Sequence, residues 1–94
     1  MKPLVWSSGF TRAFRRTVRR QPGLRVKIER TLRQLAEDPF DPALHSHKLK
    51  GELTGAWACT VDYENRILFE FVQRPESGEE EILLLTMGTH DEVY

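Results

Sequence analysis

The hydrophobic pattern of this chain changes period half-way along the sequence. Phe10, Phe14 and Val18 recur at intervals of four residues, as on one face of an amphipathic helix. From Trp57 to Tyr63 the interval is two, which is typical of a half-buried β-strand. Helices therefore precede most of the strands, and this order favours an α+β fold in which a helical layer packs on a sheet.

Two helices are expected in the first half of the chain. Ser7 or Ser8 can cap the first helix through its hydroxyl group, and residues 21–23, with their proline and glycine, interrupt it. Pro22 suits the first turn of a second helix, which should end at Asp38 because the next residue is a proline. The short break makes the two helices antiparallel. The second helix would bury Leu24, Ile28, Leu32 and Leu35.

Strands are expected on both sides of the helix pair. Residues 2–6 have the character of a short edge strand. Residues 57–63 and 67–72 alternate in polarity and should form a hairpin, with Asn65 in its turn. Residues 81–87 are apolar at neighbouring positions, as in a central strand that is covered on both faces.

Residues 38–55 contain two prolines and two glycines and show no period, so we expect a loop there. The predicted order is β-α-α-β-β-β. Residues 1–94 then form one domain, in which the antiparallel helix pair packs on a mostly antiparallel four-stranded sheet.

Length and composition limit the classes of protein that the chain can belong to. Ninety-four residues suffice for one modest core. No apolar run exceeds four residues, and the first residues lack the apolar region of a signal peptide, so we expect a cytoplasmic protein without a membrane span. Cys59 is the only cysteine, which leaves no partner for an intramolecular disulfide and too few thiolates for a cysteine-based zinc site.

The formal net charge of zero conceals an uneven distribution. Residues 1–35 contain ten of the 14 lysines and arginines, whereas residues 36–94 contain 13 of the 14 acids. The basic residues crowd the first predicted helix. Such a helix suits an acidic protein partner or phosphate groups, although a merely solvated face would show the same pattern. The residues concerned are Arg12, Arg15, Arg16, Arg19 and Arg20.

Groups that could carry chemistry gather in three segments. The predicted loop holds two histidines and two lysines within six residues, an arginine stands at the start of a strand, and the last residues include a histidine and a tyrosine. Core packing requires none of them. They are His45, His47, Lys48 and Lys50 in the loop, Arg66 in the strand, and His90 and Tyr94 in the tail.

Each of these features also has an interpretation without catalysis. A loop histidine can be solvated, Arg66 can pair with Asp62 or Glu64, and Tyr94 can cover the edge of the core. A zinc site is a further alternative, although histidines in a loop rich in glycine and proline do not fix the geometry of metal ligands. Its ligands would be His45, His47, His90 and Asp91.

Cleavage of RNA without a metal matches this set of residue types. The reaction needs a base for the proton of the 2′-OH, an acid for the departing 5′-oxygen, and cations for the charge on the phosphate. Histidine can be either acid or base near neutral pH, and arginine can hold phosphate oxygens through two hydrogen bonds. An exposed tryptophan or tyrosine can stack on an unpaired base. We therefore expect neither a metal nor another cofactor.

The layout and several short motifs resemble the RelE/ParE superfamily of bacterial toxins, and within it the YafQ-like branch. The motifs are HKLKG, GAW, YENRILFEF and LLTMGTHDEVY, and the resemblance covers nearly the whole chain. It implies a helix pair on a curved antiparallel sheet. It also implies metal-independent cleavage of mRNA at the ribosome, and inhibition by an antitoxin that wraps around the toxin.

The resemblance suggests roles for individual residues. His47 stands at the loop histidine of YafQ-like members and His90 at the histidine of their GTH motif, so these two form the expected acid–base pair. Arg66 matches an arginine that holds the phosphate, and Tyr94 matches a C-terminal aromatic residue that contacts the substrate. The strand around Cys59 lacks the acid–base lysines of RelE, which leaves open which histidine is the base. Further RNA contacts are expected from His45, Lys48, Lys50, Trp57 and Asn65.

The resemblance also implies partners. These are ribosome-bound mRNA and a cognate acidic antitoxin, encoded next to the toxin, that would contact the basic helix and assemble with it as a heterotetramer. Two alternatives use the same scaffold. One is a ParE-like toxin that binds DNA gyrase without catalysis, and the other is a plain RNA-binding module. ParE-like members usually lack the combination of histidines, arginine and terminal aromatic residue, which favours the nuclease.

Overall fold

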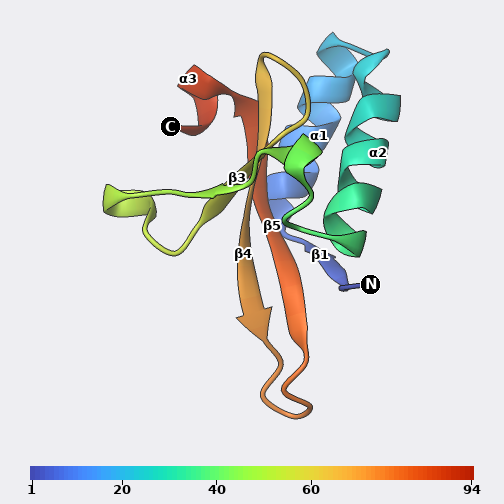
Figure 1. The fold of residues 1–94 in the computed structure, drawn as a ribbon. Helices are drawn as coiled ribbons and strands as arrows, with labels where there is room; N and C mark the ends of the chain where they lie inside the picture. The colour runs from blue at the N-terminus through green and yellow to red at the C-terminus, as the bar shows by residue number, and fades with distance from the viewer.

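Two helices cover one face of a five-stranded sheet. The computed structural model describes the backbone of residues 1–94 and every side chain except that of Glu52. Figure 1 shows α1 (Ser8–Arg20) and α2 (Leu24–Glu37) as an antiparallel pair on one side of the sheet. The α+β class and the helix pair are therefore as the sequence predicts.

Local signals in the sequence explain where both helices begin and end. The Ser7 hydroxyl accepts a hydrogen bond from the Phe10 N–H at 3.0 Å and caps α1. Pro22 lies in the turn before α2, where its carbonyl oxygen accepts from the Arg25 N–H at 3.3 Å. At the other end of α2, Asp38 adopts an extended conformation, as expected of a residue before proline.

The sheet has the strand order β1-β5-β4-β3-β2. β1 runs parallel to β5, and the other three pairings are antiparallel, so the sheet is mostly antiparallel as predicted. The prediction of four strands is wrong, because the sheet has a fifth at its edge. In chain order the strands are β1 (Leu4–Trp6), β2 (His47–Lys48), β3 (Trp57–Thr60), β4 (Asn65–Gln73) and β5 (Glu80–Thr89).

The additional strand lies in the segment that the sequence predicts as a loop. Residues 38–55 contain the short 3₁₀ helices η1 (Pro42–Leu44) and η2 (Gly51–Leu53), with β2 between them. In β2, His47 pairs with Ala58 of β3. Two residues are too few to show a hydrophobic period, which is why sequence patterning missed this strand.

The second half of the chain differs from the prediction at three further points. Asn65, predicted in the hairpin turn, is the first residue of β4. β3 ends at Thr60, three residues before the predicted end of the strand, because Asp62 organises the turn that follows: its Oδ1 accepts from the N–H groups of Glu64 and Asn65. β5 continues to Thr89 and is followed by a four-residue helix, α3 (His90–Val93), that the sequence analysis did not predict.

The core lies between the helix pair and the sheet. Its strand residues alternate along β3, β4 and β5, so the intervening side chains point to the opposite side of the sheet, which we call the far face. β5 lies inside the sheet as predicted, and Leu83 and Leu85 on its far face are half-buried, so this face is covered only in part. The buried core includes Phe10, Ala13, Leu24, Ile28, Leu32 and Leu35 of the helices and Cys59, Ile67, Phe69, Ile82, Leu84 and Met87 of the strands.

A β-bulge in β5 decides which residues reach the far face beside Arg66. Phe69 pairs with Leu84 and Leu68 pairs with Thr86, so Leu85 is an extra residue in β5. A Cβ atom on Gly9 would lie 3.0 Å from the carbonyl oxygen of Leu85, so α1 packs closely against the bulge. The register beyond the bulge pairs Arg66 with Gly88.

Within the part of the chain that the structure describes, no helix has the length and apolar character needed to cross a membrane.

Candidate active site

Helix α3 folds back over the far face at Gly88. A Cβ atom at this position would lie 2.9 Å from Glu92 Oε1 and 3.3 Å from Val93 Cγ1, so any larger residue would push α3 away. Figure 1 shows α3 on the side of the sheet opposite α1 and α2. Because Gly88 pairs with Arg66, the C-terminal residues are brought to the strand-start arginine.

Glu92 holds α3 in this position. Its Oε1 accepts from the Thr89 N–H at 2.9 Å as part of a capping box, and its Oε2 accepts from Arg20 Nη2 at 3.2 Å. The Thr89 N–H and, to a lesser degree, Arg20 lower the pKa of the Glu92 carboxyl group. One carboxylate thus joins the end of α1 to α3.

His90 of α3 packs against Tyr94, the residue that follows this helix. Their ring centroids are 4.5 Å apart with an angle of 60° between the planes. The side chain of His90 is 74% exposed, and its Nδ1 lies 3.7 Å from Asp91 Oδ1. Burial raises the pKa of Tyr94, and nearby Arg66 partly offsets this, so the phenol is neutral at neutral pH.

Arg66 is anchored by carbonyl oxygens of the β3–β4 turn. Its Nη1 donates to the carbonyl oxygens of Asp62 at 2.7 Å, Asn65 at 3.1 Å and Tyr63 at 3.2 Å. Among the described side chains, no carboxylate forms an ion pair with Arg66, and the predicted alternative pairing with Asp62 or Glu64 is not found. The guanidinium charge is therefore held in place without an internal counter-ion.

The carboxylate of Asp62 accepts its hydrogen bonds from residues of the same turn. It accepts from the N–H groups of Glu64 and Asn65 and from Asn65 Nδ2 at 3.0 Å. Burial acts to raise the pKa of Asp62, but these hydrogen bonds outweigh it and the pKa is lowered. Asn65 is buried and its amide donates to Asp62 in this turn, while its predicted contact with RNA stays a prediction.

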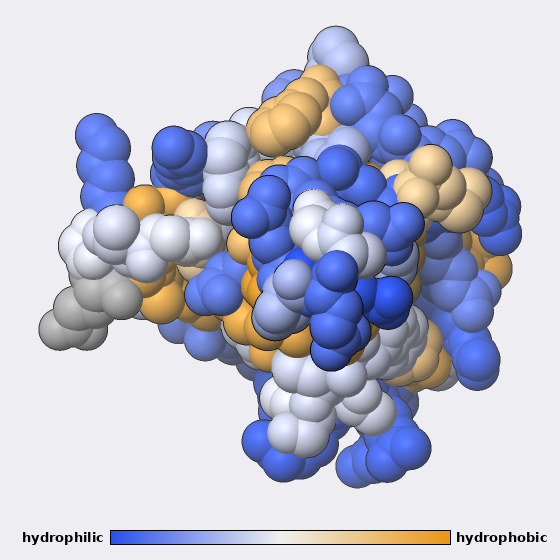
Figure 2. Space-filling model, turned by 90° about the horizontal axis from the view of Figure 1, so that it is seen from below, coloured by the Kyte–Doolittle hydropathy of each residue, from blue (hydrophilic) through white to orange (hydrophobic). Residues whose placement is uncertain are grey.

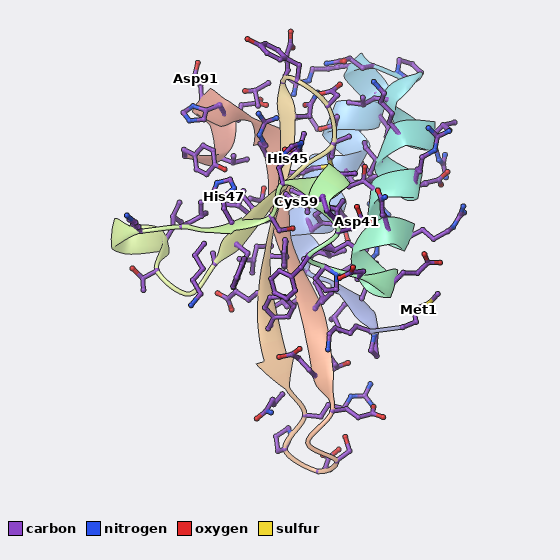
Figure 3. All side chains as sticks on the ribbon, in the orientation of Figure 1. Met1, Asp41, His45, His47, Cys59 and Asp91 are labelled. Carbon is purple, nitrogen blue, oxygen red and sulfur yellow. The ribbon has the colours of Figure 1, made fainter. Side chains whose placement is uncertain are left out.

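His47 lies on the same face of the sheet as Arg66. Its partner Ala58 pairs in turn with Leu68, and these residues alternate with the core residues of β3 and β4. His47 Nδ1 is 3.1 Å from the carbonyl oxygen of His45. A carbonyl can only accept, so Nδ1 carries the proton and Nε2 is left free. Figure 3 shows His47 on the side of the sheet that carries α3.

Lys48 and Trp57 lie on the opposite face of the sheet. Lys48 Nζ is 5.6 Å from the centroid of the Trp57 ring, which packs against Phe40 and Phe71 at the edge of the core. Figure 2 views the molecule from the end that carries the β4–β5 turn and shows orange apolar surface among blue charged groups. Lys48 and Trp57 therefore point away from His47, because neighbouring strand residues face opposite ways, and their contact with RNA stays a prediction.

The remaining predicted residues occupy the segment around β2. His45 ends η1 in a left-handed conformation with φ 50°, and its carbonyl oxygen orients His47. Lys50 is exposed at the start of η2. His45 orients the site through its carbonyl oxygen, and contacts of the His45 and Lys50 side chains with RNA stay predictions.

Neither a thiolate nor a metal ligand set emerges from the described residues. Burial raises the pKa of Cys59 to about 12, so the thiol is protonated near neutral pH. No group of three or more histidine, cysteine, aspartate or glutamate side chains among the described residues is placed to share a metal ion. The alternative zinc site of His45, His47, His90 and Asp91 thus has no ligand set in this arrangement.

Four of the five arginines on α1 are exposed and form no ion pair with a described side chain. Arg20 differs because it is bound to Glu92. Sequence analysis missed Glu92, although the pattern of a threonine followed three residues later by a glutamate is a known capping signal. The unpaired residues are Arg12, Arg15, Arg16 and Arg19.

Comparisons with known proteins identify the family. Two curated toxins, YoeB from Mycobacterium bovis and RelK from Mycobacterium tuberculosis, are each 30% identical to this chain over 64 residues, which is 68% of the chain and 68% of either relative. The chain belongs to the RelE/ParE superfamily of type II toxins. No family model matches it.

Solved structures share the fold of this RelE/ParE-superfamily toxin. A YoeB/ParE toxin from Agrobacterium tumefaciens is 22% identical, with a TM-score of 0.75 over 96% of this chain and 99% of that one. YafQ from E. coli strain BL21(DE3) is 11% identical, with a TM-score of 0.78 over 100% of this chain and 99% of that one. YafQ in the E. coli DinJ–YafQ toxin–antitoxin complex is 12% identical, with a TM-score of 0.75 over 99% of this chain and 97% of that one. The protein is the toxin of a type II toxin–antitoxin system, as its sequence motifs suggest.

Proposed function

We propose that this toxin is an endoribonuclease that cuts ribosome-bound mRNA without a metal. The observation that carries the proposal is the far face around Arg66. There, backbone carbonyl oxygens fix a guanidinium that has no ion pair with a described side chain, close enough to Tyr94 to affect its pKa. His47 of β2 lies on the same face, and His90 of α3 packs on Tyr94. An anionic phosphate would supply the missing counter-charge.

The proposed reaction transfers the phosphoryl group within the RNA strand. The base removes the proton from a ribose 2′-OH, and the 2′-oxygen forms a bond to the adjacent phosphorus atom. The bond between phosphorus and the 5′-oxygen of the next nucleotide breaks, and the acid protonates that oxygen. The products are a 2′,3′-cyclic phosphate and a 5′-OH end. Arg66 would stabilise the charge on the phosphate oxygens.

The hydrogen bond of His47 supports an assignment of the base, which leaves His90 as the acid. His47 donates Nδ1–H to the carbonyl oxygen of His45, and the free Nε2 of the neutral ring is an acceptor. We assign the base to His47 and the acid to His90. Tyr94, packed on His90 and close to Arg66, would cover the reacting nucleotide, and exposed Lys50 would contact the RNA backbone.

An antitoxin partner is supported by the DinJ–YafQ toxin–antitoxin complex, in which the structural relative YafQ is bound. We propose that this toxin binds a cognate acidic antitoxin, encoded beside it, and that a heterotetramer forms. The exposed arginines of α1 are the proposed contact, because they offer four positive charges that no described side chain neutralises. They are Arg12, Arg15, Arg16 and Arg19.

Purified protein added to a translating extract tests the proposal. Cuts at defined positions inside codons, absent with an Arg66→Ala variant that melts like the wild type, would support it. Intact mRNA with inhibited DNA supercoiling would favour a gyrase-binding toxin. Salt-sensitive RNA binding without cuts would favour a plain binding module.

A further inference from the structure

A hollow of about 340 Å³ lies between the β3–β4 turn and α3. Its walls come from two segments that are distant in the sequence, both beyond the Arg66–Gly88 pair at the same end of β4 and β5. In Figure 3 the labelled Asp91 marks the α3 side of this region. The lining residues are Tyr63, Glu64, Thr89, His90 and Asp91.

We propose that this hollow binds a nucleobase of the RNA next to the cleaved bond, and that it selects bases with an exocyclic amino group. The inference rests on the proposed nuclease function and adds a specificity site to it. Pockets of about 300 Å³ and more accommodate small organic ligands, and a single base is smaller than most of these.

Tyr63 supplies the stacking surface. It is 94% exposed, so its ring takes no part in the core. The backbone beneath it is fixed, because Arg66 Nη1 donates to the carbonyl oxygen of Tyr63 at 3.2 Å and Asp62 caps the same turn. An aromatic ring on a rigid turn can stack on an unpaired base without ordering the chain first.

The charges in the hollow favour a base over a phosphate. Glu64 and Asp91 are both exposed carboxylates, which repel a phosphate group but accept hydrogen bonds from amino groups. Adenine, cytosine and guanine carry such a group, whereas uracil does not.

The hollow is also next to the proposed chemistry. His90 lines it and packs on Tyr94, while Tyr63 and Arg66 leave the same turn. A nucleotide with its phosphate at Arg66 therefore has the hollow close by for a neighbouring base.

The first test measures single-turnover cleavage of ribosome-bound messages that differ in one base beside the cut. Wild type should cut A, C or G messages faster than U messages by roughly 5- to 150-fold, the discrimination typical of paired hydrogen bonds to a base. Glu64→Gln should reduce this preference, and Tyr63→Ala should slow all messages by a similar factor. Tyr63→Phe keeps the ring and should match wild type. Glu76→Gln, in the distant β4–β5 turn, is the control for loss of an exposed charge.

The second test does not depend on cleavage. Trinucleotides with 2′-O-methyl groups, which cannot be cut, are titrated while the resonances of Tyr63 and His90 are followed by NMR. The A, C and G trinucleotides should shift both residues at lower concentration than the U trinucleotide. Glu64→Gln should reduce this difference, and Tyr63→Ala, followed at His90, should weaken the binding of all four. Equal binding of all four, or no shift at these residues, would overturn the proposal. If Glu64→Gln left the base preference unchanged and Tyr63→Ala left the cleavage rate unchanged, the base site would be refuted but the nuclease would stand. Selective binding without any cleavage would refute only the nuclease.

Discussion

Removal of the Glu92 carboxylate should release α3 without unfolding the toxin. In Glu92→Ala the contact with the Thr89 N–H at 2.9 Å and the ion pair with Arg20 at 3.2 Å are both lost. Loss of a helix cap costs about 0.5–2 kcal/mol, and loss of an exposed ion pair about 0.2–1 kcal/mol. The docking free energy of α3 should therefore fall by roughly 1–3 kcal/mol.

A loss of this size matters because α3 has no buried residue to hold it. Every 1.4 kcal/mol changes an equilibrium about tenfold, so the ratio of docked to undocked α3 should fall by roughly 5- to 150-fold. Cleavage should fall with the docked fraction, since His90 and Tyr94 move with the helix. The melting temperature should change little, because the core between the sheet and the helix pair is untouched.

Hydrogen exchange reports the docking of α3 directly. The Tyr94 N–H donates to the carbonyl oxygen of His90 at 3.0 Å, and its protection should fall in Glu92→Ala in parallel with the cleavage rate. Glu92→Gln can keep the cap but loses the ion pair, so its effect should be intermediate. Arg25→Ala breaks a comparable exposed ion pair with Glu29 at 3.4 Å and should change neither quantity.

The protection of the Tyr94 N–H against hydrogen exchange should fall when Glu92 becomes protonated. The pKa of Glu92 is lowered in the folded protein from its ordinary value of 4.5, so its contribution is present above pH 4.5 and is lost as the pH falls below it. Wild-type cleavage and wild-type protection of Tyr94 in Glu92→Ala would refute the reasoning, because α3 would then be held by something else.

Three further predictions concern the metal, the partner and the tail. Toxin treated with EDTA and then desalted should still cleave mRNA and leave 2′,3′-cyclic phosphate ends, because the proposed acid, base and cation are side chains. Activity that returned only with zinc would point to the alternative metal site. The double variant Arg15→Glu, Arg16→Glu should bind the antitoxin more weakly and with less dependence on salt, as measured by titration at several salt concentrations. Unchanged affinity would mean that this helix face is only solvated. Tyr94→Ala should lower the single-turnover rate while the melting temperature stays close to wild type, because Tyr94 is 41% exposed. A wild-type rate with a lowered melting temperature would show that the tail only packs on the core.

The long, periodic elements could be predicted from the sequence, because their own residues determine them. The interval of four in α1 and the interval of two in β3 and β4 reflect burial against one core. β2 and α3 could not be predicted in this way. β2 exists because His47 and Lys48 pair with β3, and α3 is held in part by an arginine that is 72 residues away in the sequence.

Sequence reasoning predicted only part of the candidate site, because the rest depends on how the strands pair. Composition and motif indicated His47, Arg66, His90 and Tyr94, which lie on the far face or on α3. The same reasoning grouped Trp57 and Lys48 with them, because the face of a strand residue depends on register, and a shift of one position reverses it. The bulge at Leu85, which brings Gly88 opposite Arg66, is likewise invisible in a run of apolar residues.

The most direct test of the account is the single-turnover rate of mRNA cleavage on the ribosome by His47→Gln and His90→Gln, each with a thermal melt. Glutamine preserves polarity and approximate size but cannot act as a general acid or base near neutral pH. Each substitution should lower the rate by about 10²–10⁴, the usual contribution of a general acid or base, with melting temperatures close to that of wild type. Wild-type rates in both variants would show that the two histidines do not catalyse the reaction and would contradict the proposed mechanism.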